Sequence, residues 1–462
     1  MKLESQNRLT AKAYAAIMLC IVLLAGCSQR TPISSSAVDS PTAQTVLTTE
    51  ASAPEKQSNT PSQPEKKGPE PSVFSLTLNN RMELSPNRKF SLGLDQLVRE
   101  DYARLNHKRI CVVTSRLALD SNGEHLLETL LPKRNPIVTR VVLLDDELPS
   151  PARSDKLNSL LAAYPEIRIF GLSANNPSIT DVMLQDTEVV LLDLPYRGLR
   201  TNPEFALLGS VMLECHAKGL KMLVLDRPIA ISGGLTSGPT GKAEDFTSTK
   251  SFFPVPIIPG LTLAEFARMY NREYGLAIDL EVISLLFWNR FTGFAQLMSV
   301  YEEKSITPWV SFEEWDQYYS TNQRLVELQL TQELLPGIAT ISQSEGVLEI
   351  AAPENAEELL KVLKENTSAY GVVVSLKENL ITLENPKTVN PVELSFAIIL
   401  AMQNFTEEPI ADQFIEGLAA QEYSAILKSG ANVQQIRQAW SQSDLHLRFT
   451  LKRQGYFLST GQ

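Results

Sequence analysis

Continuously apolar segments alternate with amphipathic segments along the chain from about Leu92 to Asp279. Short apolar runs of this kind predict buried strands; they cover 109–114, 137–144, 168–172 with its flank, 188–193 and 221–226. Segments with helical spacing of apolar residues lie between them; they cover 94–107, 121–131, 154–165, 178–184 and 203–219. This alternation is typical of a parallel sheet covered on both faces. We therefore predict a Rossmann-like, doubly wound α/β domain.

The pattern changes after about Asp279 and predicts a second, smaller domain of the α+β class. Two segments there have helical spacing, ENAEELLKVLKENT and VELSFAIILAMQNF, and three read as strands, VLEIAA, YGVVVSL and NLITLE. The C-terminal stretch is predicted to be helical with a break at Gly430. The predicted domain limits are 73–280 for the first domain and 281–462 for the second.

The N-terminal residues 1–26 have the order of a signal peptide, with a basic leader followed by an apolar run. The stretch Leu24-Ala25-Gly26-Cys27 resembles the bacterial lipobox, which implies that Cys27 becomes the lipid-bearing first residue. An uncleaved anchor or an ordinary secretory signal is the alternative. Residues 27–72 are rich in Ser, Thr and Pro and are expected to form a disordered tether. We expect a cell-envelope protein held at a membrane by lipid; because Ser28 follows the cysteine, the resemblance favours the outer membrane where a host has two.

The charge, cysteines and motifs of the 462 residues argue against nucleic acid as a partner and against disulfide, metal and cofactor sites. The formal net charge of −11 argues against nucleic acid as a partner, because phosphates would be repelled. Cys111 and Cys215 lie in apolar patterns and are expected to be small buried residues rather than a disulfide. The chain has no CxxC or HExxH motif, so no metal is predicted. No GxGxxG motif follows the first predicted strand, so no dinucleotide or other cofactor is expected.

Acidic residues follow three of the predicted strands. The run VVLLDDELPS continues through Asp146 to Glu147, EVVLLD ends at Asp193, and KMLVLD ends at Asp226. The carboxyl ends of parallel strands meet at one edge of a sheet, where ligands bind in open α/β folds. Crowded carboxylates raise one another's pKa, which suits a general acid. Alternatively, each acid caps the next helix or begins a turn.

Several segments between about Leu92 and Ser459 carry a recognisable order of motifs. They are KRICVVTSRLALDSNGEHLLETL, VVLLDDELP, EVVLLDLPYRGLR, MLVLDRPIAISGG, FPVPIIPGLTLAEFARMYN and the C-terminal stretch from FIEGLAAQEYSAIL to GYFLS. In this order and spacing they resemble the family of NamZ-type exo-β-N-acetylmuramidases. Within FPVPIIPGLTLAEFARMYN, Glu265 and Arg268 are expected on a helix face with a structural role.

The resemblance implies an activity and a set of site residues. Members of that family release terminal N-acetylmuramic acid from peptidoglycan fragments, which would be the partners of this chain. Glu147 falls at the family's proposed catalytic glutamate and is the expected general acid, with Asp193 as its partner carboxylate. Asp226 and Arg227 match an Asp-Arg-Pro motif, and Arg227 is a candidate for binding the lactyl carboxylate of muramic acid. Both residues could instead only hold a loop.

The chain also departs from the family pattern at the site. Leu148 and Pro149 replace the histidine and glycine that follow the family's glutamate, and Ser115-Arg116 replaces an Asn-Gln pair after the first strand. The polar motifs that the family carries beyond Trp309 are absent. Two functions therefore stay open, an active exo-muramidase and a catalytically silent lipoprotein that binds peptidoglycan or another envelope partner. A solute-binding lipoprotein unrelated to the family ranks below both.

Overall fold

The computed structural model of the protein describes residues 91–145, 151–241, 253–291, 323–342, 346–384, 389–406 and 409–458. The predicted signal peptide, the tether, Cys27 and Glu147 lie outside these residues. Among the described helices, none is long and apolar enough to cross a membrane. All described residues belong to one compact unit that spans 86–462.

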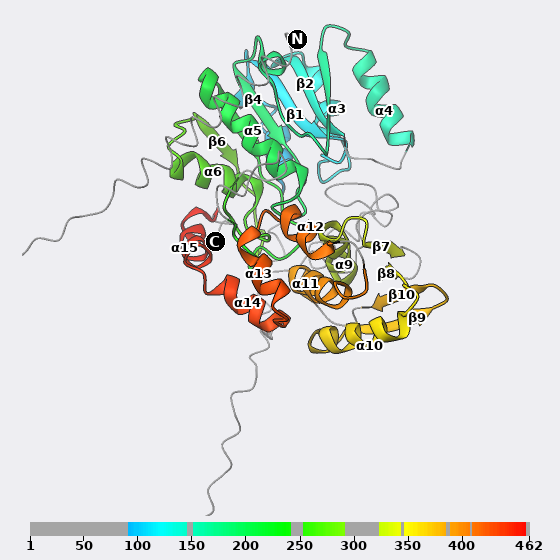
Figure 1. The fold of residues 1–462 in the computed structure, drawn as a ribbon. Helices are drawn as coiled ribbons and strands as arrows, with labels where there is room; N and C mark the ends of the chain where they lie inside the picture. The colour runs from blue at the N-terminus through cyan, green and yellow to red at the C-terminus, as the bar shows by residue number, and fades with distance from the viewer. Residues whose placement is uncertain are drawn as a thin grey trace, which may run out of the picture. The chain divides into compact units, whose positions relative to one another are not determined.

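Six parallel strands form the main sheet (Figure 1). Their order is β3-β2-β1-β4-β5-β6, so the chain reverses its direction of growth across the sheet between β1 and β4. This is the order of the Rossmann fold, and the predicted fold class is confirmed. The strands are β1 (Arg109–Ser115), β2 (Ile137–Asp145), β3 (Arg168–Ser173), β4 (Val189–Asp193), β5 (Lys221–Leu225) and β6 (Leu280–Ile283).

Helices cover both faces of the sheet, because successive residues of each strand point to opposite faces. Val112 of β1 packs with leucines of α2 (Gly93–Arg99), α3 (Leu126–Leu130) and α4 (Pro151–Ala162). Val113, the next residue, packs with residues of α5 (Pro203–Lys218) and α6 (Leu263–Glu273) on the other face. Short 3₁₀ turns are η1 (Ala103–Leu105), η2 (Leu131–Lys133) and η3 (Asp181–Leu184).

The second region contains a separate antiparallel sheet of order β7-β8-β10-β9. The predicted α+β character is confirmed, and the helical C-terminal segment breaks at Gly430, which has a φ of +79°. Helix α11 is buried along its whole length. The strands are β7 (Ala339–Ser342), β8 (Val347–Ala351), β9 (Val373–Lys377) and β10 (Leu380–Glu384). The helices are α9 (Gln323–Leu334), α10 (Ala356–Thr367), η6 (Ser368–Tyr370), α11 (Pro391–Met402), α12 (Ile410–Gly417), η7 (Gln421–Tyr423), α13 (Ser424–Lys428), α14 (Val433–Ser441), α15 (Asp444–Arg453) and η8 (Gln454–Tyr456).

Several elements differ from the sequence prediction. The helix predicted over 94–107 ends at Arg99, because Asp101 and Tyr102 adopt left-handed conformations with φ of +48° and +60°. The helix predicted over 178–184 is only the 3₁₀ turn η3. Strand β6, which crosses the predicted domain limit at residue 280, was not anticipated. The domain limits themselves stay predictions.

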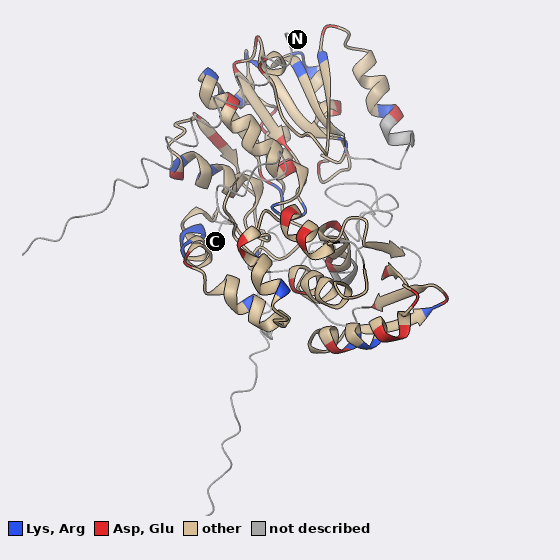
Figure 2. Ribbon diagram, in the orientation of Figure 1, with Lys and Arg blue, Asp and Glu red and all other residues tan. Residues whose placement is uncertain are grey.

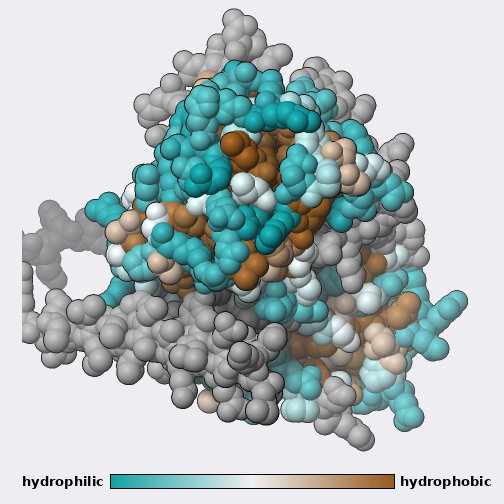
Figure 3. Space-filling model, turned by 90° about the horizontal axis from the view of Figure 1, so that it is seen from above, coloured by the Kyte–Doolittle hydropathy of each residue, from teal (hydrophilic) through white to brown (hydrophobic). Residues whose placement is uncertain are grey.

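Hydrophilic and apolar residues are distributed as in an ordinary globular protein. The face seen in Figure 3 is mostly hydrophilic, with apolar residues gathered in separate patches. Cys111 and Cys215 are both buried and free, as the sequence predicted. Burial raises the pKa of each thiol to about 12, so neither is a reactive thiolate at neutral pH.

Candidate active site

The acid-bearing strand ends lie at one edge of the main sheet. Asp193 is in register with Thr114 of β1, and Ser115 is in register with Leu144 of β2, one residue before Asp145. Strand β5 lies on the other side of β4 and ends at Leu225, just before Asp226. The predicted gathering of the three strand ends is therefore confirmed. Glu147, the predicted general acid, lies outside the described residues.

Asp193 and Arg227, two of the predicted site residues, bind each other. Arg227 donates from Nε to Oδ1 of Asp193 at 2.5 Å and from Nη2 to Oδ2 at 2.8 Å. Its Nη1 donates to the carbonyl oxygen of Leu119 at 2.8 Å. The side chains are 0% and 2% exposed, so the pair is removed from solvent. In this arrangement Arg227 occupies both carboxyl oxygens of Asp193 and ties the ends of β4 and β5 to the loop after β1.

His125 completes this polar cluster, and the sequence analysis did not identify it. Its Nε2 atom lies 2.9 Å from the carbonyl oxygen of Ser115, and its Nδ1 atom accepts a hydrogen bond from the N–H of Leu127 at 3.1 Å. Accepting at Nδ1 leaves the proton on Nε2, which donates to Ser115. Burial lowers the pKa of His125, so the ring is neutral. The sequence analysis placed His125 inside a helix predicted over 121–131, whereas α3 begins at Leu126 and His125 is its N-cap.

The reversal of strand order between β1 and β4 is the place where open α/β folds bind ligands. Asp193 ends β4 there, and Ser115 ends β1. In this protein the space is occupied by its own buried groups, Arg227 and His125, which are hydrogen-bonded to both strand ends. The described part of this edge around Asp193 and Ser115 is therefore a hydrogen-bonded polar network.

Asp226 lies on the opposite face of the sheet from Asp193. Burial, followed by repulsion from Glu265 of α6, raises the pKa of Asp226 to about 8. Its Oδ2 accepts a long hydrogen bond of 3.5 Å from the N–H of Leu285, and no described group donates to its Oδ1 with good geometry. The nearby Thr262 hydroxyl partly opposes the rise in the pKa. Asp226 and Asp193 thus end adjacent strands without sharing a site.

Glu265 has the structural role that the sequence analysis favoured. It forms a capping box with Thr262 at the start of α6 and an ion pair with Arg290, and it accepts a hydrogen bond from the N–H of Leu458 at 2.9 Å. The carboxylate is 1% exposed. Glu265 therefore fastens the C-terminal segment to the first sheet, while Arg268, on the same helix, is exposed.

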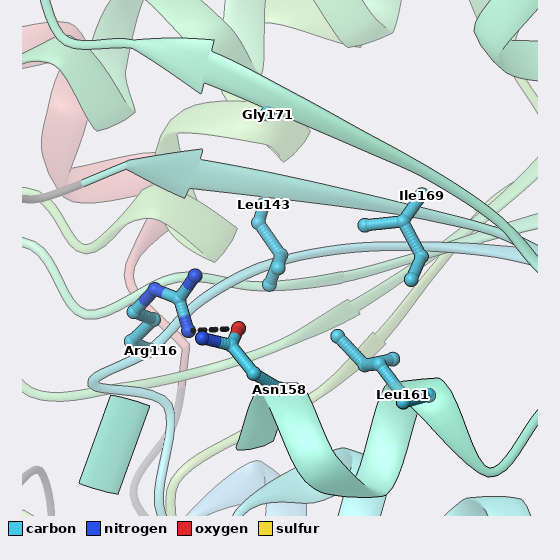
Figure 4. Close-up of a pocket in the computed structure, with 7 residues that line it drawn as sticks. Arg116, Leu143, Asn158, Leu161, Ile169 and Gly171 are labelled. Carbon is cyan, nitrogen blue, oxygen red and sulfur yellow. Dashed lines mark hydrogen bonds between the residues drawn. The ribbon is translucent and has the colours of Figure 1, made fainter. Parts of the chain in front are cut away.

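A pocket of about 370 Å³ lies between the face of β2 and β3 and helix α4. Figure 4 shows Leu143 and Ile169 on the strands opposite Leu161 on α4, which together form an apolar wall. At one end, Arg116 donates a hydrogen bond to Oδ1 of Asn158 at 3.2 Å. The 146–150 segment, which carries Glu147, connects the two elements that form the walls, β2 and α4.

Among the described residues, no group of three or more His, Cys, Asp or Glu side chains could hold a metal ion. The acids at the strand ends are either paired, as Asp193 is, or isolated on another face, as Asp226 is.

Comparison with known proteins places this geometry in a family. A family model for the N-terminal part of the exo-β-N-acetylmuramidase NamZ matches residues 110–307, which include β2 to β6 and all of β1 except its first residue. The peptidoglycan β-N-acetylmuramidase NamZ of Bacillus subtilis (strain 168) is 23% identical over 223 residues. The match covers 48% of this chain and 53% of that protein, so the chain spans about half the length of this relative.

Solved structures show the same fold. Two DUF1343 family proteins from Bacteroides fragilis NCTC 9343 superpose with TM-scores of 0.62 and 0.54. Each is 18% identical, and each match covers 81% of this chain and all of the other. The family-model match and the similarity to NamZ support the assignment of the chain as a divergent member of the NamZ family.

Proposed function

We propose that the protein is a muramidase of the cell envelope that removes terminal N-acetylmuramic acid from peptidoglycan fragments. The observation that carries this proposal is the position of the acid-bearing strand ends at one edge of a sheet whose residues match the NamZ family model. The similarity to a peptidoglycan β-N-acetylmuramidase supports a muramidase-like activity and peptidoglycan-derived substrates.

In this proposal Glu147 is the general acid and Asp193 is its partner. Strands β2 and β4 are both neighbours of β1. Adjacent strands are about 4.8 Å apart, so the two strand ends are separated by about 9–10 Å. Glycosidases separate their two carboxyl groups by about 5–9.5 Å, according to the stereochemical outcome. The spacing of the two strands is of the order that such a pair requires.

The pocket between β2, β3 and α4 supports the same location. A ligand bound there would contact apolar side chains on one side and reach the Arg116 end, close in sequence to the end of β1. The segment that carries Glu147 joins β2 to α4, and both elements line the pocket.

One observation favours a second function, a catalytically silent protein that binds peptidoglycan. Asp193 is completely buried, and Arg227 occupies both of its oxygens. Arg227, the candidate for binding a lactyl carboxylate, is buried in the same pair and also donates to Leu119. Catalysis by Asp193 would require Arg227 to release it, whereas a silent scaffold would keep the pair intact.

Hydrolysis assays distinguish the two functions. The full-length chain, Glu147→Gln and Asp193→Asn are each incubated with a chromogenic β-glycoside of N-acetylmuramic acid and with muropeptides. Release by the native chain that is lost in both variants, with unchanged circular dichroism, supports the enzyme with both proposed residues. Activity that survives in Asp193→Asn assigns Asp193 a structural role. No release, together with retention of the chain on insoluble peptidoglycan, supports the silent binder.

We also propose that Cys27 carries the lipid that holds the protein in the envelope. The basic leader, the apolar run and the residues before Cys27 support this assignment. Radiolabelled palmitate should be incorporated into the native chain and not into Cys27→Ser, and the variant should leave the membrane fraction. Equal labelling of both chains would contradict the proposal.

A further inference from the structure

A second pocket, of about 240 Å³, lies beside the amino-terminal end of β6, away from the strand ends that carry the acids. It is formed by helix α6, the beginning of β6 and the 3₁₀ turn η8 near the C-terminus. The residues that line it are Arg268, Asn271, Arg272, Leu280, Gly455 and Tyr456.

Two guanidinium groups dominate this pocket. Arg268 and Arg272 are one turn apart on the exposed side of α6. Among the described residues, neither makes an ion pair or a side-chain hydrogen bond. Like charges at this spacing repel each other and disfavour the helix. An acid follows at Glu273, but it already accepts hydrogen bonds from Lys452 and from the hydroxyl of Tyr456.

The positive charge is local in a chain whose formal net charge is −11. Figure 2 shows basic segments on α6 and on the neighbouring α15. Lys452 of α15 adds a further positive charge beside Glu273. An anion entering the pocket would therefore meet two guanidinium groups whose charge no described carboxylate neutralises by direct contact.

The walls of the pocket are held in place. Both backbone groups of Ile278 are bonded by the amide of Asn271, each at 3.0 Å, which fixes the loop between α6 and β6. The capping box at Thr262 fixes the start of α6. A Cβ atom at Gly455 would meet no atom within 4 Å, so this wall is open. Preorganised walls reduce the entropy lost when a ligand binds.

From these features we infer that the pocket binds a phosphoryl group. A single guanidinium fork is enough to bind both oxygens of a carboxylate. Two forks suit a group with three acceptor oxygens and up to two negative charges, which a phosphate monoester provides. The group can belong to a soluble phosphate monoester or to a lipid whose headgroup is a phosphate monoester, and both present three terminal oxygens to Arg268 and Arg272.

Titration calorimetry of the full-length chain with inorganic phosphate tests the site. All titrations are made at constant ionic strength, and acetate, a carboxylate, is titrated in parallel for comparison with phosphate. The double variant Arg268→Gln/Arg272→Gln should weaken phosphate binding by at least about tenfold, because hydrogen bonds to charged groups are the strong ones. Gly455→Leu should weaken it as well, by filling the pocket with all charges retained. The matched control is Arg168→Gln, an exposed arginine on β3 at the other edge of the sheet, which should bind as the native chain does.

Saturable phosphate binding that is lost in both pocket variants, and stronger than acetate binding, supports the inference. Absence of saturable binding, or equal binding by the native chain and both variants, overturns it. Circular dichroism and Tm of each variant show whether it is folded. If Arg268→Gln/Arg272→Gln does not fold, the binding of phosphate by Gly455→Leu decides the inference.

Two further arms identify the source of the phosphoryl group. Glucose 6-phosphate serves as the soluble monoester, and vesicles of phosphatidic acid with phosphatidylcholine serve as the lipid source. Vesicles are tested with Cys27→Ser, so that a lipid anchor does not contribute. Binding of either probe that is lost in the double arginine variant supports the site and names its source. Binding of neither probe, by a chain that also fails to bind phosphate, overturns it.

Discussion

Arg453 of α15 reaches across Gly260 so closely that a Cβ atom added to the glycine would overlap its Nη1 atom. Nη1 donates to the carbonyl oxygens of Gly233, Pro259 and Gly260 at 3.0 to 3.3 Å, and Nη2 donates to Gly234 at 3.0 Å. The Gly-Gly and Pro-Gly pieces of the family resemblance thus form a cradle for one C-terminal arginine. Their role in this chain is to join segments distant in sequence.

The first prediction concerns this cradle. Gly260→Ala should be strongly destabilising, because its φ of +64° is unfavourable for alanine and because both Arg453 and the backbone carbonyl of Leu235 must move. Gly275→Ala is the matched control, since its φ is +61° and its added Cβ meets nothing within 4 Å. We expect the control to cost about 1–2 kcal/mol, and Gly260→Ala to cost about 2–3 kcal/mol more through lost charged hydrogen bonds. Urea unfolding measures both; equal losses would contradict the cradle.

The second prediction concerns the buried pair of Asp193 and Arg227. Asp193→Asn or Arg227→Met leaves one buried charge without its partner, so each should reduce the free energy of unfolding by about 3–5 kcal/mol. The double variant Asp193→Asn/Arg227→Met should be more stable than either single variant, because no buried charge remains. Denaturant unfolding of the four chains forms a double-mutant cycle. A coupling energy near zero would show that the pair does not form.

The sheet was predictable because its strands are continuously apolar, and their carboxyl ends necessarily meet at one edge. The face on which each acid lies was not predictable. Asp193, the last residue of β4, lies on the same face of the sheet as Leu191, whereas Asp226, the residue after β5, lies on the same face as Val224. Leu191 and Val224 belong to different core clusters. Which of the two alternating sets of residues in a strand faces which helices is fixed only by the packing of the folded sheet. That is why two acids at similar sequence positions do not meet.

Other features depended on loops that a sequence pattern does not position. Arg227 pairs with a residue 34 positions away only because the loop after β5 turns toward β4. Strand β6 escaped prediction because it has four residues, includes the half-buried Glu281, which forms ion pairs, and lies at the sheet edge. Edge strands are short and polar by necessity, so their pattern differs little from that of a loop.

The third prediction concerns His125, which caps α3 and donates to Ser115. His125→Ala should lose the cap, worth about 1 kcal/mol, and one hydrogen bond to the buried Ser115 carbonyl, worth about 0.5–1.5 kcal/mol, because the N–H of Ala118 still donates to that carbonyl. His125→Asn keeps an oxygen that can accept from Leu127, so it should be less destabilising than the alanine variant. Thermal unfolding ranks the three chains. Equal stability of the alanine variant and the native chain would contradict the assigned hydrogen bonds.

The last prediction is a pH dependence that originates at Asp226. Its pKa in the folded protein is about 8, whereas the ordinary value is 3.8, so the folded protein holds a proton that the unfolded chain releases. Folding is therefore favoured by this group below pH 3.8, and that contribution is lost as the pH rises to about 8. Within this window the loss is about 1.4 kcal/mol per pH unit. Asp226→Asn cannot titrate, so its stability relative to the native chain should increase from pH 4 to pH 8 and stay constant above. Urea unfolding of both chains at one-unit intervals measures this difference, and a difference independent of pH would show that Asp226 is ionised in the folded protein.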